Sequence, residues 1–197
     1  MPSPIAHSAF GYALTRLPIV QSHRQQKQLP GHLWPFISLT GLYSLLVANL
    51  PDLDFLPQLL TGINVHRGPS HSLSAAFIVS TILAWVIQRA RPQFSYKALF
   101  LLTFAIYGSH LLFDFFTAGG SGIPLLWPFS AQPFISPFSV FPGVHHSRGL
   151  WDSSHLIFIT IETLYSLGLF IALQFVLPLF KGRTQPEQSR LDDYTTH

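Results

Sequence analysis

The feature that most constrains this chain is a series of apolar segments long enough to cross a lipid bilayer. Residues 98–118 and 155–180 contain one acidic side chain each and neither lysine nor arginine. A membrane-spanning helix needs about 20 mostly apolar residues, within a range of roughly 17–25. Both segments reach this length, and residues 34–50 and 73–88 come close to it. We therefore predict an all-α, multi-pass membrane helical bundle.

The composition agrees with a membrane location and limits the chemistry. Of 197 residues, 48% are hydrophobic and only 10% are charged, whereas a soluble domain carries about 25% charged residues. The absence of cysteine excludes disulfides and thiolate metal sites. A net charge of +3 without a basic cluster does not predict nucleic-acid binding. We expect one membrane-embedded domain over residues 1–181 and a disordered polar tail over residues 182–197.

Lysine and arginine are distributed unevenly along the chain, which predicts an orientation. Arg67 and Arg148 lie in two of the loops, and the other basic residues lie in three further segments. These segments contain Arg16, Arg24 and Lys27, then Arg89, Arg91 and Lys97, and finally Lys181, Arg183 and Arg190. Because cytoplasmic loops are enriched in positive charge, residues 51–72 and 119–154 are expected on the periplasmic side of a bacterial inner membrane, with the C-terminus in the cytoplasm.

The number of crossings depends on residues 4–20, which His7 and Arg16 interrupt. If this segment spans the membrane, the chain has five crossings, and if it lies in the interface there are four. The expected outer loop 119–144 is rich in proline, glycine and aromatic residues. That composition is typical of a segment at the level of the lipid headgroups, and it makes membrane lipids the expected partners.

The same orientation gathers the ionisable residues of the apolar segments on one face. Residues 65–72 read VHRGPSHS, residues 51–54 read PDLD, and the stretch HLLFD places its histidine and aspartate four residues apart on one helix face. Together with the N-terminal histidine, these stretches supply seven candidate metal ligands. They are His7, Asp52, Asp54, His66, His71, His110 and Asp114.

Each stretch also has a purely structural interpretation. PDLD could end a helix, with its carboxylates in water and Pro51 breaking the helix. VHRGPSHS could be a turn in which Ser70 or Ser72 caps the following helix, a role compatible with ligand binding. His110 and Asp114 could form a buried pair that only joins helices. Ionisable groups inside an apolar segment are costly and tend to be functional, which favours a site.

The chemistry of these residues favours a divalent metal. Carboxylates brought together near lipid repel one another and lose hydration unless a cation neutralises them. Imidazole and carboxylate ligands without thiol suit zinc. The number of candidate ligands predicts one or two ions, with metal-activated water hydrolysing a phosphoester of a lipid or lipid-linked headgroup. Asp52 or Asp54 would activate the water and Arg67 would hold the phosphate, although Arg67 could equally face lipid headgroups.

The stretches PSPIAHSAFGY, NLPDLDFL, HRGPSHSL, SHLLFDFFTAGG and LLWPFS occur in this order over residues 2–130. This set resembles the membrane-bound metal-dependent hydrolases described as LexA-binding and inner-membrane-associated. That family is related to the all-α superfamily of zinc-dependent phospholipase C and single-strand nuclease. The resemblance implies a similar fold core and implies that His7, one aspartate of PDLD, one histidine of HRGPSHS, His110 and Asp114 are ligands. It also implies that Asp114 bridges two metals.

One departure from the superfamily puts a further metal site in doubt. The soluble members complete it with an H-x-x-x-E helix, whereas here His155 is followed four residues later by Ile159. Glu162 shares a helix face with His155, and His145 and His146 precede them. These four residues would rebuild a site or, in the interpretation that we favour, Glu162 and His155 form a buried hydrogen bond.

Two other classes of function remain open at this level. A transporter would pass a metal ion or proton, but the candidate ligands gather at one face and trace no path across the membrane. A non-catalytic membrane protein would use the metal only to hold its helices together. A zinc protease is disfavoured because the chain lacks an H-E-x-x-H motif, and a cysteine protease is excluded because it has no cysteine.

Overall fold

A computed structural model describes residues 4–16, 39–62, 66–118, 121–141 and 154–181. These ranges contain helices and isolated β-bridges but no β-strand, so the predicted all-α class is confirmed for the described residues. The helices are α1 (Pro4–Thr15), α3 (Leu39–Asn49), η2 (Pro51–Asp54), α4 (Phe55–Thr61), η3 (Pro69–His71), α5 (Leu73–Ala90), α6 (Tyr96–Phe115) and α7 (Ser154–Lys181). The predicted tail, residues 182–197, lies outside the described residues.

Local sequence signals explain where the long helices begin. The Ser72 side chain accepts a hydrogen bond from the backbone N–H of Ala75 and caps α5. Ser95 does the same for α6 through Ala98. Serine at these positions satisfies a backbone donor that the first turn leaves free. Of the two serines proposed as the cap of α5, the structure therefore selects Ser72.

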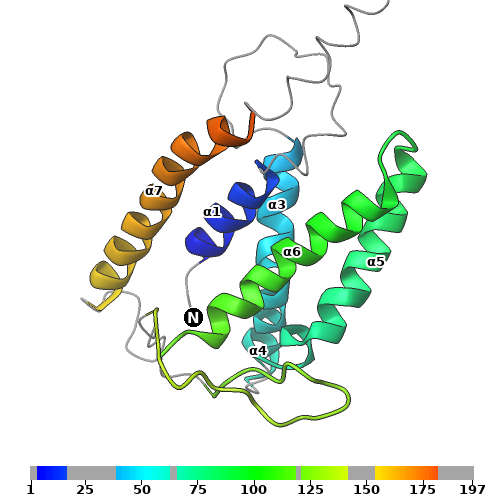
Figure 1. Cartoon of the computed structure of the whole chain (residues 1–197). Helices are drawn as coiled ribbons and strands as arrows, with labels where there is room; N and C mark the ends of the chain where they lie inside the picture. Colours follow the sequence, from blue (N-terminus) through cyan, green and yellow to red (C-terminus); the bar gives the residue numbers. More distant parts are fainter. Residues whose placement is uncertain (1–3, 17–38, 63–65, 119–120, 142–153, 182–197) are drawn as a thin grey trace, which may run out of the picture.

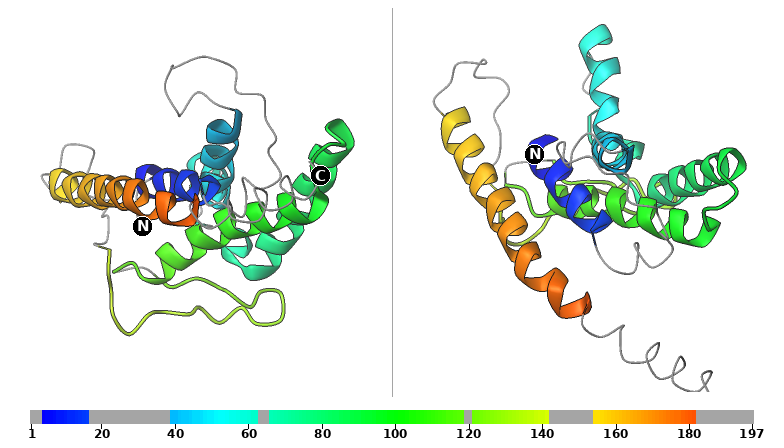
Figure 2. Two further views of the ribbon diagram at one scale, coloured as in Figure 1. Left: turned by 45° about the horizontal axis from the view of Figure 1, so that its top comes forward. Right: turned by 90° about the horizontal axis from the view of Figure 1, so that it is seen from above.

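Helix α1 lies at the centre of the bundle and packs against α3, α6 and α7, while α5 pairs with α6 (Figures 1 and 2). The buried core between α3, α5 and α6 includes Ala48, Ala76, Ile106 and Tyr107. Gly11 allows α1 to approach α3 closely, because a Cβ at this position would lie 3.0 Å from the Cβ of Ala48. Close packing of α1 against its neighbours fixes the position of His7.

Two described helices, α5 and α6, are long and apolar enough to cross a membrane by length and composition. This is fewer than the four to five spanning helices predicted from the sequence. Helices α1 and α3 have 12 and 11 residues, which at 1.5 Å per residue is only about half of a 30 Å hydrocarbon layer. Helix α7 has 28 residues, and its described apolar stretch is Thr160–Ala172.

Residues 121–141 form an extended loop across one end of the bundle, below α4, α5 and α6 in Figure 1. The loop is joined to the start of α5 because the backbone N–H of Leu73 donates to the carbonyl of Leu125. It exposes several large apolar side chains, among them Phe129, which is 92% exposed. The candidate site described next lies at this same end of the molecule.

Candidate metal centre

Four of the seven predicted ligands meet at one point between three elements. Asp52 belongs to η2, His71 ends η3, and His110 and Asp114 lie one turn apart on α6. One ligand atom from each residue lies within 4.8 Å of the corresponding atom of every other. The side chains of His71, His110 and Asp114 are fully buried, and that of Asp52 is 16% exposed. Asp52 is therefore the member of the group that solvent reaches.

The distances between these four residues fit a small cation. His71 Nε2 lies 3.5 Å from Asp52 Oδ1, 3.3 Å from Asp114 Oδ2 and 3.3 Å from His110 Nε2. His110 Nε2 lies 3.5 Å from Asp52 Oδ1 and 3.9 Å from Asp114 Oδ2. Ligands bound at about 2.0–2.1 Å in a tetrahedron are about 3.3 Å apart. Most of the measured separations are close to that value.

Both histidines are held through their other ring nitrogen. His110 Nδ1 lies 2.7 Å from the carbonyl oxygen of Ala48, which can only accept a hydrogen bond. His71 Nδ1 lies 3.2 Å from Asp54 Oδ2 and 3.0 Å from Ser70 Oγ. With Nδ1 as the donor, the lone pair of each Nε2 faces the other ligands. This outer hydrogen bonding is typical of metal-binding histidines.

Several buried polar atoms of the cluster lack a hydrogen-bond partner within the described part of the chain. They are Asp52 Oδ1, both carboxylate oxygens of Asp114 and both ring nitrogens of His7. An unsatisfied buried polar atom costs about 1–3 kcal/mol, and more when it is charged. A cation among these atoms would satisfy them, so the donor set fits a divalent metal ion.

The pKa values of Asp52 and His71, which lie in the short helices η2 and η3, also show the effect of the clustered charges. Burial acts to raise the pKa of the Asp52 carboxyl, but the neighbouring imidazoles of His110 and His71 outweigh it and hold the pKa below its usual range. Burial acts to lower the pKa of His71, yet the surrounding carboxylates of Asp114, Asp52 and Asp54 raise it to about 10. The clustered carboxylates thus favour a cationic partner at their centre.

His7 joins the cluster from α1 without entering the group of four. Its ring stacks on that of His110, with centroids 3.8 Å apart. Its Nε2 lies 4.0 Å from Asp114 Oδ1, the oxygen on the other side of the carboxylate from His71. His7 therefore lies next to Asp114, and its role as a ligand stays a prediction.

The two remaining predicted ligands are Asp54 and His66. They lie on the Nδ1 side of His71, away from the other three ligands. Asp54 Oδ1 pairs with His66 Nδ1 at 2.7 Å, and its Oδ2 accepts a hydrogen bond from Ser70 Oγ at 2.7 Å. Burial acts to raise the pKa of Asp54, but the bonds to His66, His71 and Ser70 lower it below its usual range. Asp54 therefore orients His71, and His66 supports Asp54.

Arg67 reaches the cluster through an unusual backbone conformation. Its φ is 60°, the left-handed region that non-glycine residues rarely adopt. Its side chain is buried, with Nε 3.5 Å from Asp114 Oδ2. Of the two interpretations left open by the sequence, this position supports a role beside the ligands over contact with lipid headgroups. Strain of this kind tends to occur at functional sites.

The sequence did not indicate three supporting groups. The carbonyl of Ala48 is a backbone atom with no sequence signal. Ser70 was considered only as a cap, and its bond to Asp54 depends on the turn geometry. Tyr107 donates a hydrogen bond to the carbonyl of Ser70 at 2.7 Å. In the sequence, the role of Tyr107 was indicated only by its position one helical turn before His110.

The residues proposed for a further site are only partly described. His145 and His146 lie outside the described residues, and the same holds for the side chain of His155. Glu162 is buried in α7, with 1% of its surface exposed. The predicted Glu162–His155 hydrogen bond therefore stays a prediction.

Comparison with known proteins adds a family. The family model of the YdjM inner membrane protein matches residues 1–189. The chain belongs to this family. It is also 36% identical over 101 residues to the inner membrane protein YbcI of Escherichia coli (strain K12), a match that covers 49% of the chain and 57% of that relative. No solved structure matches the chain significantly.

Membership of an inner membrane protein family agrees with the membrane location predicted from the apolar segments. The aligned part of YbcI spans less than two thirds of that relative. The names of the family and of this relative mention neither a reaction nor a metal. The resemblance to metal-dependent hydrolases therefore enters below only as part of a proposal.

Proposed function

We propose that this member of the YdjM family is a metal-dependent hydrolase that cleaves a phosphoester at the outer face of the inner membrane. Asp52, His71, His110 and Asp114 would hold a divalent cation, with zinc the expected ion. If a second ion is bound, His7 would help to hold it together with Asp114 Oδ1. The substrate class is a lipid or lipid-linked headgroup.

One observation carries this proposal: the group of four presents nitrogen and oxygen atoms to a common centre, and three buried carboxylate oxygens among them have no hydrogen-bond partner within the described residues. When bound, a divalent ion there supplies Lewis-acid polarisation and lowers the pKa of bound water to about 7. The resemblance of the sequence motifs to the zinc-dependent phospholipase C superfamily favours phosphoester hydrolysis as the reaction. An all-helical fold is compatible with that relationship.

The residues around the four ligands have separate expected roles. Asp52 is the most exposed of them, so it would orient a water that enters from solvent. Asp54 and Ser70 would keep His71 in place through its Nδ1. Arg67 contacts Asp114 through Nε, which leaves the ends of its guanidinium to bind a phosphate oxygen.

The expected orientation is supported by the helical hairpin of α5 and α6. Its turn lies between Arg89 and Lys97, and the candidate metal centre lies at the opposite end, where α5 begins and α6 ends (Figure 1). Positive charge favours the cytoplasmic side. The centre would then face the periplasm. Four to five crossings would further require α7 and the α1–α3 region to span the bilayer.

The test combines metal analysis with a turnover screen. We expect purified protein to bind about one or two equivalents of zinc, to hydrolyse a phosphoester, and to lose both properties when His110 or Asp114 is replaced by alanine. Ser109→Ala is a matched control, because Ser109 neighbours His110 and its hydroxyl donates to the Ile106 carbonyl within α6. Retained activity in Asp114→Ala would overturn the proposal.

The same experiment separates the alternative functions. A metal that only holds helices together predicts that chelation unfolds the protein and that every phosphoester stays intact. A transporter predicts metal uptake into proteoliposomes without hydrolysis. The position of the cluster at one end of α5 and α6 argues against a path across the membrane.

A further inference from the structure

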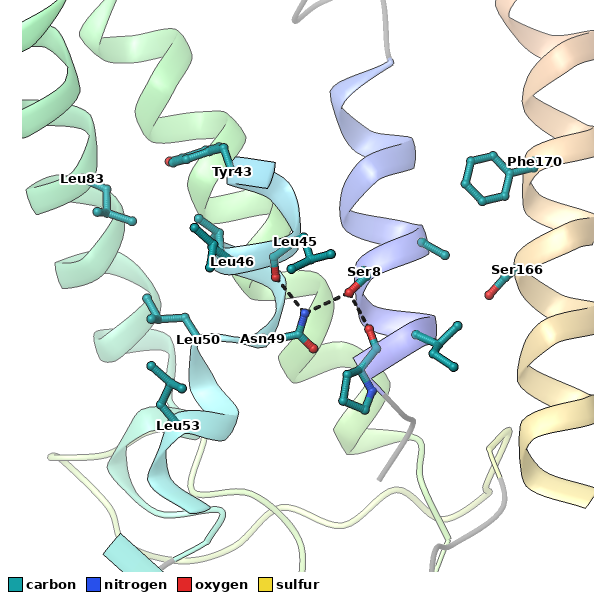
Figure 3. Close-up of a pocket in the computed structure, with 14 residues that line it drawn as sticks. Ser8, Tyr43, Leu45, Leu46, Asn49, Leu50, Leu53, Leu83, Ser166 and Phe170 are labelled. Atoms are coloured by element: carbon teal, nitrogen blue, oxygen red, sulfur yellow. Dashed lines mark hydrogen bonds between the residues drawn. The ribbon is translucent and has the colours of Figure 1, made fainter. Parts of the chain in front are cut away.

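An apolar groove runs along the outside of the bundle between α1, α3 and α7, with Leu83 of α5 at one side (Figure 3). Its cavity volume is about 820 Å³, within the range of small-molecule sites, roughly 300–1,000 Å³. None of the described residues that line it is charged. Apolar side chains such as Ile5, Leu46 and Phe170 form most of the wall.

Three residues that line this groove are close in sequence to candidate ligands. Ser8 lines the groove and directly follows His7 in α1. Leu50 and Leu53 also line it, and they flank Asp52 in the chain. A molecule in the groove would therefore have one end close to the residues that carry the metal ligands.

The groove also contains one polar position with an unused acceptor. Asn49 Nδ2 donates to the carbonyl of Leu45 at 2.7 Å and to Ser8 Oγ at 2.9 Å (Figure 3). Because the Leu45 carbonyl can only accept, the amide nitrogen must face it, and Oδ1 is the remaining atom. Asn49 Oδ1 is buried and has no hydrogen-bond partner within the described residues. It would accept a hydrogen bond from a ligand hydroxyl.

The groove opens to an exposed apolar surface of the bundle. Ile5, Leu46 and Leu53 line it and are each more than half exposed. A hydrocarbon chain can enter such a groove sideways from the lipid without crossing water. A charged peptide segment would find no partner for its charges there.

We propose that this groove binds the hydrocarbon chain of a glycerophospholipid with a free glycerol hydroxyl, and that the hydroxyl donates to Asn49 Oδ1. The phosphate then lies at the end of the groove next to Asp52. This assignment rests on the proposed phosphoester hydrolysis and narrows its substrate to a single-chain, lysophospholipid-type amphiphile. The groove would select lipid over water-soluble phosphoesters.

The experiment uses photolabelling, which needs no catalysis. Full-length protein, stripped of metal in phosphatidylcholine nanodiscs, is irradiated with a lysophosphatidic acid that carries a diazirine in mid-chain. Labelled residues are then mapped by mass spectrometry. We expect the label on α1 and α3 residues of the groove, and at least a fivefold loss in Leu46→Trp, which fills it.

Leu42→Trp is the matched control, because Leu42 lies one turn away on α3, is 50% exposed and does not line the groove. It should label like the wild type. Equal labelling of both tryptophan variants would overturn the proposal, as would equal labelling of lipid-facing residues on α5 such as Phe77 and Ile78. Either result would indicate only bulk lipid around the protein.

A second pair of measurements tests the hydrogen bond from the ligand hydroxyl to Asn49. Asn49→Leu should reduce labelling by the lysolipid but not by a diacyl analogue without the free hydroxyl, and an equal loss for both would overturn the hydroxyl assignment.

Turnover measurements distinguish a failure of the groove proposal from a failure of the proposed function. Groove labelling without any hydrolysis contradicts the hydrolase alone, whereas equal kcat/KM for glycerol 3-phosphate and the lysolipid contradicts the groove alone.

Discussion

His71 and His110 present their Nε2 atoms to each other across 3.3 Å, although 39 residues separate them in the sequence. Each ring is fixed from behind, His110 by the carbonyl of Ala48 and His71 by Asp54. Two lone pairs that face one another at this distance repel unless a cation or a proton lies between them. With Asp52 and Asp114 closing the group, the arrangement supports a metal ion at its centre.

Asp54→Asn should weaken metal binding without abolishing it. Asp54 holds His71 from outside the ligand group, and loss of such a partner typically lowers metal affinity by about 10–100-fold. At saturating zinc, the variant should still bind the wild-type number of equivalents, whereas Asp114→Ala should not. Competition against a chromophoric chelator measures both quantities.

Thr61→Ala, in the neighbouring α4, is the control for this comparison, because Thr61 lies outside the cluster and its hydroxyl donates to the Pro57 carbonyl of its own helix. It should leave the zinc affinity unchanged. An Asp54→Asn protein with wild-type affinity would show that His71 needs no such support. A complete loss of binding would instead place Asp54 among the ligands.

Substitutions at Arg67 should separate its charge from its backbone conformation. Arg67→Gly suits the positive φ and relieves a strain of roughly 1–2 kcal/mol, but it removes the guanidinium. We expect kcat/KM for the phosphoester to fall by tenfold or more in this variant. Arg67→Lys should recover only part of the activity, since an ammonium cannot bind phosphate through two parallel hydrogen bonds. Full activity in Arg67→Gly would exclude a role in substrate binding.

The sequence predicted the helices well where apolar length and a cap coincide. Residues 73–88 and 98–118 were expected as helices, and α5 and α6 span Leu73–Ala90 and Tyr96–Phe115. The count of spanning helices was too high for the described residues, because apolar composition does not fix where a helix ends. Residues 34–50 were expected as one apolar segment, of which α3 covers Leu39–Asn49, and residues 34–38 lie outside the described residues.

The sequence indicated the residues that meet at the cluster but could not rank them as ligands. Asp52 and Asp54 are two residues apart in a 3₁₀ helix of about three residues per turn, so they point in different directions. The choice of His71 over His66 depends on the turn around Arg67, whose positive φ no pattern revealed. The carbonyl of Ala48 is free to hold His110 because the last turn of a helix leaves its carbonyls without backbone donors.

Gly11 and Gly108 should respond in opposite directions to alanine. A Cβ at Gly11 would lie 3.0 Å from Ala48 Cβ and 3.1 Å from Ile106 Cγ2, so α1 would have to move. Overpacking of this kind typically costs about 1–3 kcal/mol. A Cβ at Gly108 meets no atom within 4 Å, and alanine in a helix is favoured over glycine by up to about 1 kcal/mol. Thermal unfolding in detergent should show a lower Tm for Gly11→Ala and an equal or higher Tm for Gly108→Ala.

Because α1 carries His7, the Gly11→Ala variant also tests whether α1 contributes to the cluster. A shift of α1 should weaken zinc binding in that variant, while Gly108→Ala should bind zinc like the wild type. If Gly11→Ala lowers the Tm without any change in zinc affinity or stoichiometry, His7 does not take part in metal binding.

Ser72→Ala should destabilise the start of α5, because the Ser72 hydroxyl accepts from the Ala75 N–H and donates to the Pro69 carbonyl. Loss of a serine cap costs about 1 kcal/mol, or a Tm decrease of roughly 2–4 °C for a chain of this size. Thr81→Ala is the control, since its hydroxyl donates to the carbonyl of Phe77 in the interior of α5. An equal Tm change in both variants would show that Ser72 acts only as a polar helix residue and not as the cap of α5.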